Sequence, residues 1–158
     1  MTEKTRVYLI RHGEVAGAGT PRYNGHADVA LSEHGVAQYH QMKERFADAR
    51  ISACYTSDLS RCAIGAEIIG RHLGVTPVRE RNLRELDIGA WEGKTWDELK
   101  ANHTEEWQAR LDDIVNYRVP GGKTCAISTT ASCRSWTGSL RDTGAKRCSW
   151  SRTAGLTA

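Results

Sequence analysis

Long apolar runs are missing from this 158-residue sequence, and so is a hydrophobic stretch near its N-terminus. A membrane-spanning helix needs about 20 consecutive apolar residues, and Met1-Thr2-Glu3-Lys4 lacks the apolar core of a secretory signal. The five cysteines form no Cys-x-x-Cys pair and are too few for a disulfide scaffold in a chain of this length. We therefore expect a soluble, cytoplasmic globular protein without a membrane partner.

A general excess of one charge is also absent, although the charges are unevenly placed. Residues 123–158 hold six Lys/Arg and one acid, a net charge of +5, whereas residues 1–122 hold 16 basic and 18 acidic residues, a net charge of −2. The basic excess is thus confined to the last 36 residues. The sequence therefore gives no reason to expect a nucleic-acid partner for the folded part.

Residues 1–122 alternate between short apolar runs and amphipathic segments. Val7–Ile10 is rich in strand formers and suits a buried parallel strand. Ser32 is a good helix N-cap, and Gly74 is a good helix end. Alternating strands and helices imply an α/β fold with helices on both faces of a mostly parallel sheet. Further strands are expected over 51–55 and 76–78, and helices over 33–47, 59–73 and about 95–113.

The tetrapeptide Arg11-His12-Gly13-Glu14 follows the first expected strand. Ligands of open α/β sheets bind at the carboxyl ends of the strands, so His12 is well placed for chemistry. A guanidinium matches phosphate oxygens, glycine lets the backbone approach a ligand, and a neutral imidazole in the right tautomer is a nucleophile. Taken alone, the tetrapeptide is equally consistent with a surface loop that carries a charged pair.

Further motifs follow this tetrapeptide in a fixed order. They are Asn24-Gly25-His26-Ala27-Asp28, Leu31-Ser32-Glu33-His34-Gly35, Ser57-Asp58-Leu59-Ser60-Arg61, and Leu83-Arg84-Glu85 with Gly89 and Trp91-Glu92-Gly93. Over about residues 5–122, the chain thereby resembles the histidine phosphatase superfamily. The resemblance implies a phosphoglycerate mutase-like, three-layer α/β/α fold that is truncated at its C-terminus.

The resemblance also implies a role for each matching residue. His12 would be the nucleophile that becomes phosphorylated, and Glu85 would donate a proton to the leaving oxygen. Arg11 and Arg61 would clamp the phosphoryl group, because two guanidinium groups stabilise its negative charge. The remaining substrate contacts would come from Gly13 and from the backbone of Asn24 and Gly25. No metal or other cofactor is expected, and the implied partner is a small-molecule phosphate ester.

The substrate is less sharply indicated. Tyr23-Asn24-Gly25-His26, the Gly89–Gly93 motif and Glu105-Glu106-Trp107 are most similar to α-ribazole phosphatases of cobalamin nucleotide-loop assembly. Broad-specificity phosphatases share much of this pattern, and the short connection from Glu85 to Pro120 argues against a mutase. The family often has Thr or Ser three residues after the nucleophile and Asn six after it, where this chain has Val15 and Ala18. Both differences remove a side-chain hydrogen bond to phosphate.

A second histidine, which the superfamily needs opposite the first, is missing because no His follows His103. After Gly122 the chain has 13 Ser/Thr, only three residues of the Ile/Leu/Val class, and no apolar periodicity. A one-base loss near the Gly122 codon explains this. In the alternative frame, the codons of Arg147–Gly155 permit a hydrophobic run followed by His-Gly-Gly, and those of Lys123–Trp136 permit an amphipathic helix.

We therefore expect residues 1–122 to form an incomplete histidine phosphatase domain and residues 123–158 to form an aberrant, poorly packed tail. Without the strand that carries the second histidine, the Val7–Ile10 edge of the sheet would lie open. Three alternatives remain: an impaired phosphatase, an inactive phosphate-binding remnant, and a non-catalytic phosphate-binding module with a short tail. The oligomeric state is not indicated.

Overall fold

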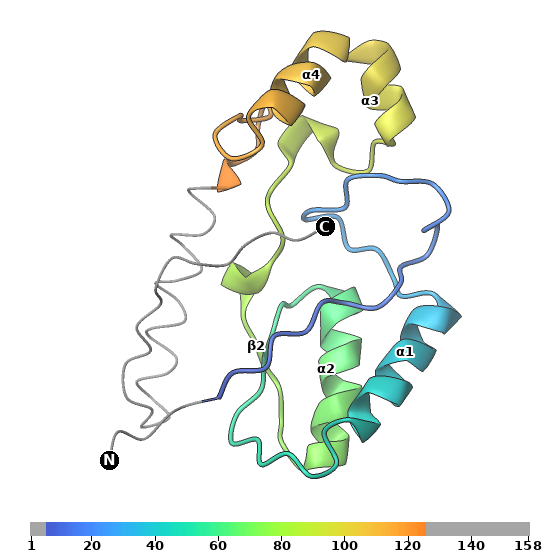
Figure 1. The fold of residues 1–158 in the computed structure, drawn as a ribbon, viewed down its shortest axis with the longest axis vertical. Helices are drawn as coiled ribbons and strands as arrows, with labels where there is room; N and C mark the ends of the chain where they lie inside the picture. Colours follow the sequence, from blue (N-terminus) through green and yellow to red (C-terminus); the bar gives the residue numbers. More distant parts are fainter. Residues whose placement is uncertain (1–5, 126–158) are drawn as a thin grey trace.

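The structure, a computed structural model, describes residues 6–125. Helices dominate this part of the chain, and the strands are short (Figure 1). In chain order the elements are α1 (Glu33–Glu44), β1 (Tyr55–Thr56), α2 (Ser60–Leu73), β2 (Val78–Arg79), the 3₁₀ turns η1 (Arg81–Leu83) and η2 (Gly89–Trp91), α3 (Trp96–Asn102) and α4 (Thr104–Asp112). No helix within residues 6–125 is long and apolar enough to cross a membrane.

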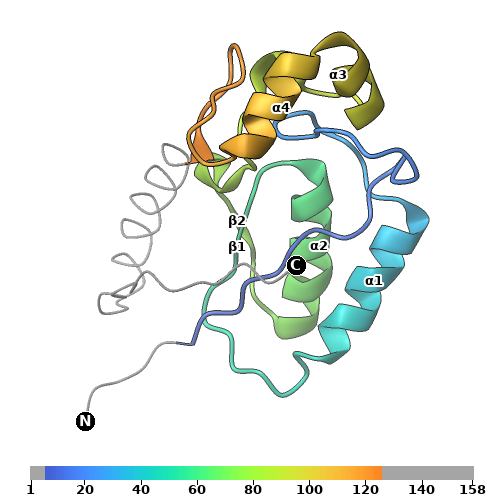
Figure 2. The ribbon, with the colours of Figure 1, turned by 45° about the horizontal axis from the view of Figure 1, so that its top comes forward.

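Strands β1 and β2 pair in parallel, with Tyr55 opposite Val78 and Thr56 opposite Arg79. Helix α2 connects them, so these three elements form a βαβ unit. Helix α1 packs along α2, as both views show (Figures 1 and 2). The predicted α/β class with parallel pairing is therefore confirmed. Within residues 6–125, the sheet itself consists of these two strands.

Local chemistry sets the start of α1 and the end of α2 where the sequence predicted them. The Ser32 side chain accepts a hydrogen bond from the Gly35 N–H at 3.0 Å and caps α1. Gly74 ends α2 with a left-handed φ of 68°, which a residue without a side chain adopts at little cost. Helix α1 is three residues shorter than predicted. The predicted helical stretch over 95–113 is two helices, because the backbone leaves the helical conformation at His103.

The prediction that Val7–Ile10 forms a buried strand is wrong for this structure. The segment is extended but lies outside the two-stranded sheet, and the exposed fractions of its four side chains run from 38% to 86%. Within the described part of the chain, its one aromatic contact is the edge-on packing of Tyr8 against Phe46 at 5.3 Å between ring centroids. A parallel strand becomes buried only when neighbours cover it on both faces and at its edges, and this segment has no paired neighbour among residues 6–125.

Two separate hydrophobic clusters hold the structure together. The first joins α1 to α2 through Tyr39, Phe46 and Ile69. The second lies under α3 and α4. There the ring centroids of Trp91 and Trp107 are 6.0 Å apart, and the ring of Tyr23 packs against both. The chain that follows β2 leads from the part of the structure with α1 and α2 to the part with α3 and α4 (Figure 2). The buried members of the second cluster are Leu86, Ile88, Trp91, Leu99, Trp107 and Val119.

The beginning of the expected tail is anchored. The Lys123 N–H donates to the Asp87 carbonyl at 2.8 Å, and Cys125 is half-buried against the second cluster. The remainder of the expected tail, residues 126–158, lies outside the described residues. The prediction that this tail packs poorly against the core therefore concerns residues that the structure does not describe.

Candidate functional site

His12 lies on the extended segment that precedes α1, and its ring is half-buried. The ring Nδ1 lies 2.7 Å from the carbonyl oxygen of Gly13. Because a carbonyl oxygen can only accept, this contact requires the proton to be on Nδ1. Nε2 then carries the lone pair of the neutral imidazole. The local backbone therefore selects the tautomer in which Nε2 is the nucleophilic nitrogen.

The Tyr39 hydroxyl brings the His12–Gly13 segment and helix α2 together. It donates to the Arg61 carbonyl oxygen at 3.4 Å, and the Gly13 backbone hydrogen-bonds to it. Burial, assisted by the nearby Cys62 thiol, raises the pKa of Tyr39 to about 12, and the Gly13 hydrogen bond opposes this rise. Tyr39 therefore remains a neutral hydroxyl that fixes the predicted nucleophile segment beside the first turn of α2.

Arg61 is almost completely buried, with an exposed fraction of 2%. Its Nη1 donates to the Ala27 carbonyl at 2.7 Å, and its Nη2 donates to the carbonyls of Asn24 and Gly25 at 2.7 and 2.8 Å. The guanidinium thus holds the loop of residues 24–27 against α2. Its Nε–H is buried without an acceptor among the described residues, and the side-chain oxygen of Asn24 is buried there without a donor. An unpaired buried donor is costly, so the Arg61 Nε–H is a group that an added acceptor would stabilise.

Glu85 and Asp28 act electrostatically on the same turn of α2. The pKa of the Cys62 thiol is raised, mainly by burial; Arg61 lowers it, whereas Glu85 and Asp28 raise it further. Glu85 is exposed, and among residues 6–125 its carboxylate accepts a hydrogen bond only from the neighbouring Leu86 N–H, at 3.1 Å. Its outer oxygen is therefore accessible to a ligand.

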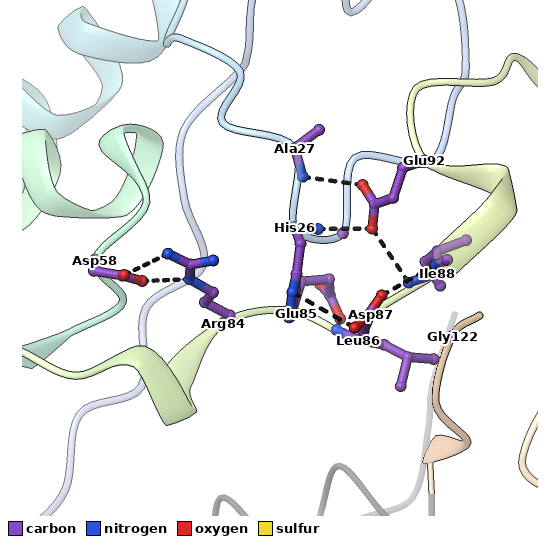
Figure 3. Close-up of polar contacts among 12 residues, drawn as sticks. His26, Ala27, Asp58, Arg84, Glu85, Leu86, Asp87, Ile88, Glu92 and Gly122 are labelled. Atoms are coloured by element: carbon purple, nitrogen blue, oxygen red, sulfur yellow. Dashed lines mark hydrogen bonds and ion pairs between the residues drawn. The ribbon is translucent and has the colours of Figure 1, made fainter.

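An Arg84–Asp58 ion pair fixes the residue next to Glu85. Nε and Nη2 of Arg84 donate to the two carboxylate oxygens of Asp58 at 2.6 and 2.5 Å (Figure 3). This bidentate bond lowers the pKa of Asp58. It ties the turn before α2 to the chain at Glu85, so the predicted proton donor is held near the first turn of α2.

The structure joins four of the seven predicted site residues through hydrogen bonds, and Arg61 contacts Asn24 and Gly25 directly. Gly13, Asn24, Gly25 and Arg61 are linked by hydrogen bonds through Tyr39 and the loop. Among residues 6–125, no hydrogen bond or ion pair joins His12 to Arg61 or Glu85, and Arg11 is exposed without a polar partner. In the same part of the chain, no three His, Cys, Asp or Glu side chains are arranged to hold a metal ion.

Glu92 is a polar residue of this site to which the sequence assigned no role. Its carboxylate accepts backbone N–H groups from His26 at 2.8 Å, Ala27 at 3.0 Å and Ile88 at 3.2 Å (Figure 3). It therefore fastens the 24–27 loop to the 84–92 segment. The one sequence signal was its place in the Trp91-Glu92-Gly93 motif.

Comparisons with known proteins agree with this arrangement. The profile of the histidine phosphatase superfamily (branch 1) matches residues 7–146. The chain is 37% identical over 118 residues to the probable phosphoglycerate mutase GpmB of Erwinia tasmaniensis. The matched region covers 75% of this chain and 55% of that protein. A protein of the same name from Klebsiella pneumoniae is 36% identical over 119 residues, with the same coverage. The chain therefore spans about half the length of the curated relatives that it matches.

Solved structures give the same fold. A mycobacterial glucosyl-3-phosphoglycerate phosphatase in complex with VO3 superposes with a TM-score of 0.75 at 25% identity, over 83% of this chain and 64% of that one. The α-ribazole phosphatase from Shigella flexneri superposes with a TM-score of 0.76, over 85% of this chain and 66% of that one. Its identity of 21% bears on the fold alone. The phosphoglycerate mutase-like α/β fold predicted from the sequence is thereby confirmed.

Proposed function

Because the chain belongs to the histidine phosphatase superfamily (branch 1), we propose that it carries the nucleophile-bearing part of a metal-independent phosphomonoesterase. The observation that carries the proposal is the buried Arg61 guanidinium, whose Nε–H has no acceptor among the described residues. A phosphoryl oxygen would supply that acceptor. The contact of His12 Nδ1 with the Gly13 carbonyl supports the same chemistry, because in a neutral ring it leaves the lone pair on Nε2.

The proposed reaction has two displacements. The Nε2 lone pair of His12 attacks phosphorus, the ester P–O bond breaks, and Glu85 gives its proton to the leaving oxygen. Water then attacks the phosphohistidine, Glu85 takes up a proton from that water, and the P–N bond breaks to release phosphate. During both steps, Arg11, Arg61 and the backbone of Gly13, Asn24 and Gly25 would stabilise the charge on the phosphoryl oxygens.

The substrate we propose is a small phosphate ester, with α-ribazole 5'-phosphate of cobalamin nucleotide-loop assembly first among the candidates. The motifs around Tyr23 and Gly89 support this choice. The curated relatives named probable phosphoglycerate mutases support a mutase-type alternative, and the short connection between Glu85 and Pro120 argues against it. A broad-specificity phosphatase is the remaining enzymatic alternative. The cytoplasmic location stays a prediction.

We also propose that residues 123–158 are translated in a shifted frame and that residues 1–122 are an incomplete domain. The change of composition after Gly122 supports this. The second histidine would then be lost, and with it one fixed hydrogen-bond donor to the transition state. Such a loss costs about 10²–10³ in rate. An inactive phosphate-binding remnant is the limiting case.

The experiment compares hydrolysis of p-nitrophenyl phosphate by the 158-residue chain and by a chain whose frame is restored after the Gly122 codon. We expect the restored chain to be faster by about 10²–10³. In both chains His12→Asn should abolish turnover, whereas His34→Asn, at an exposed position of α1, should not. Turnover that survives His12→Asn would overturn the proposed mechanism. An intact reading frame in the resequenced gene would overturn the frameshift.

A further inference from the structure

The peptide unit between Gly25 and His26 lies between two opposite charges. Its carbonyl oxygen accepts from Nη2 of Arg61 at 2.8 Å, and its N–H donates to Oε1 of Glu92 at 2.8 Å. In a trans peptide these two groups point in opposite directions, so the guanidinium and the carboxylate flank the same unit. Each charge is aligned with the peptide dipole and strengthens the hydrogen bond on the other side.

Ala27 provides a second connection between the two side chains, through two successive peptide units. Its N–H donates to Oε2 of Glu92 at 3.0 Å, and its carbonyl accepts from Nη1 of Arg61 at 2.7 Å. Both oxygens of Glu92 and both terminal nitrogens of Arg61 are therefore engaged by one short loop. Gly25 allows this arrangement, because a Cβ there would lie 2.5 Å from Oε1 of Glu92.

This arrangement explains how a buried guanidinium keeps a free donor. A direct carboxylate partner would occupy the fork of Arg61, and an unpaired buried charge would be strongly destabilising. Here the loop carbonyls satisfy the terminal nitrogens, and Glu92 supplies the compensating charge across the peptide units. The Nε–H remains without an acceptor among the described residues.

We propose that Glu92 is a positioning residue of the phosphate site. It holds the 24–27 loop in place, and the loop carbonyls in turn orient Arg61 so that its Nε–H faces the phosphoryl group. The role rests on the proposed function for its ligand, but the coupling of Glu92 to Arg61 can be measured without any ligand.

The test uses the full chain labelled with ¹⁵N-arginine, in which the Nε–H resonance of Arg61 is assigned by its loss in Arg61→Lys. Glu92→Gln is compared with Glu98→Gln. Glu98 is a matched control because its carboxylate also accepts a backbone N–H, that of Thr95 at 2.8 Å, in the cap of α3. We expect Glu92→Gln to shift the Arg61 resonance and to weaken orthovanadate binding about tenfold, as for one misaligned charge-assisted hydrogen bond. Glu98→Gln should change neither.

An Arg61 resonance that stays in place in Glu92→Gln, or that moves equally in Glu98→Gln, would overturn the positioning role. If the unmutated chain binds no orthovanadate, the proposed function fails for this chain, while the resonance still decides the role of Glu92. If Glu92→Gln does not fold, Glu92→Asp, which keeps the charge, replaces it, and the shift of the Arg61 Nε–H resonance is measured in the same way. A resonance unmoved by this shorter side chain would likewise count against the proposal.

Discussion

The ring of Tyr39 in α1 lies directly over the α-carbon of Gly65 in α2. A Cβ placed on Gly65 would be 1.9 Å from Cζ of the ring, well inside any real contact distance. The two helices therefore approach each other here without a side chain on α2. The same close approach of the helices positions the Tyr39 hydroxyl along α2, where it joins Gly13 to the Arg61 carbonyl.

Gly65→Ala should therefore destabilise the protein, although alanine is the better helix former by about 1 kcal/mol. The overpacking should cost about 1–3 kcal/mol, so the free energy of unfolding in urea falls. Tyr39→Ala removes the obstructing ring, so Gly65→Ala should cost much less in that background. Equal effects in both backgrounds would contradict the packing explanation.

Gly25→Ala should disturb both the stability and the phosphate site. The new Cβ would lie 2.1 Å from the Leu86 carbonyl oxygen, so the loop has to move away from the 84–92 segment. We expect a loss of about 1–3 kcal/mol in urea denaturation, together with weaker orthovanadate binding. Gly19→Ala is the matched control, because nothing lies within 4 Å of its Cβ position. Its effect should stay within about 0.5 kcal/mol.

Acid should weaken the Asp58–Arg84 bond. The pKa of Asp58 is lowered in the folded protein, first by its hydrogen bond with Arg84. The unfolded chain therefore takes up this proton at a higher pH than the folded one, and stability falls as the pH drops below the ordinary Asp value of about 3.9. In Asp58→Asn, the unfolding midpoint should depend less steeply on pH than in the unmutated chain. The difference is expected between about pH 5 and pH 2, from roughly one pKa unit above the ordinary Asp value to two below it. An unchanged slope would show that the bond does not contribute.

Trp107 should matter far more than Trp96 for the second hydrophobic cluster. The ring centroids of these two tryptophans are 5.9 Å apart, but Trp107 is 8% exposed and Trp96 is 44% exposed. Trp107→Ala should cost about 3–5 kcal/mol, as for a buried tryptophan, and Trp96→Ala clearly less. Chemical denaturation followed by circular dichroism measures both. A larger loss for Trp96→Ala would mean that the cluster is centred elsewhere.

The sequence by itself determined the features that depend on neighbouring residues. Ser32 and Gly74 could be placed at helix ends because a capping hydroxyl and a left-handed glycine act within one turn. The α/β class followed from the alternation of apolar runs, and the family from motifs that keep their order along the chain. His12, Arg61 and Glu85 were named as candidates on the same basis.

Tertiary structure decided which groups meet. It left Val7–Ile10 exposed, because burial of a strand depends on neighbours distant in sequence. It directed the terminal nitrogens of Arg61 to loop carbonyls 34 to 37 residues away, and it gave Glu92 its part in the site. Hydrogen bonds between such distant segments depend on how the two hydrophobic clusters pack, and no local pattern encodes that packing.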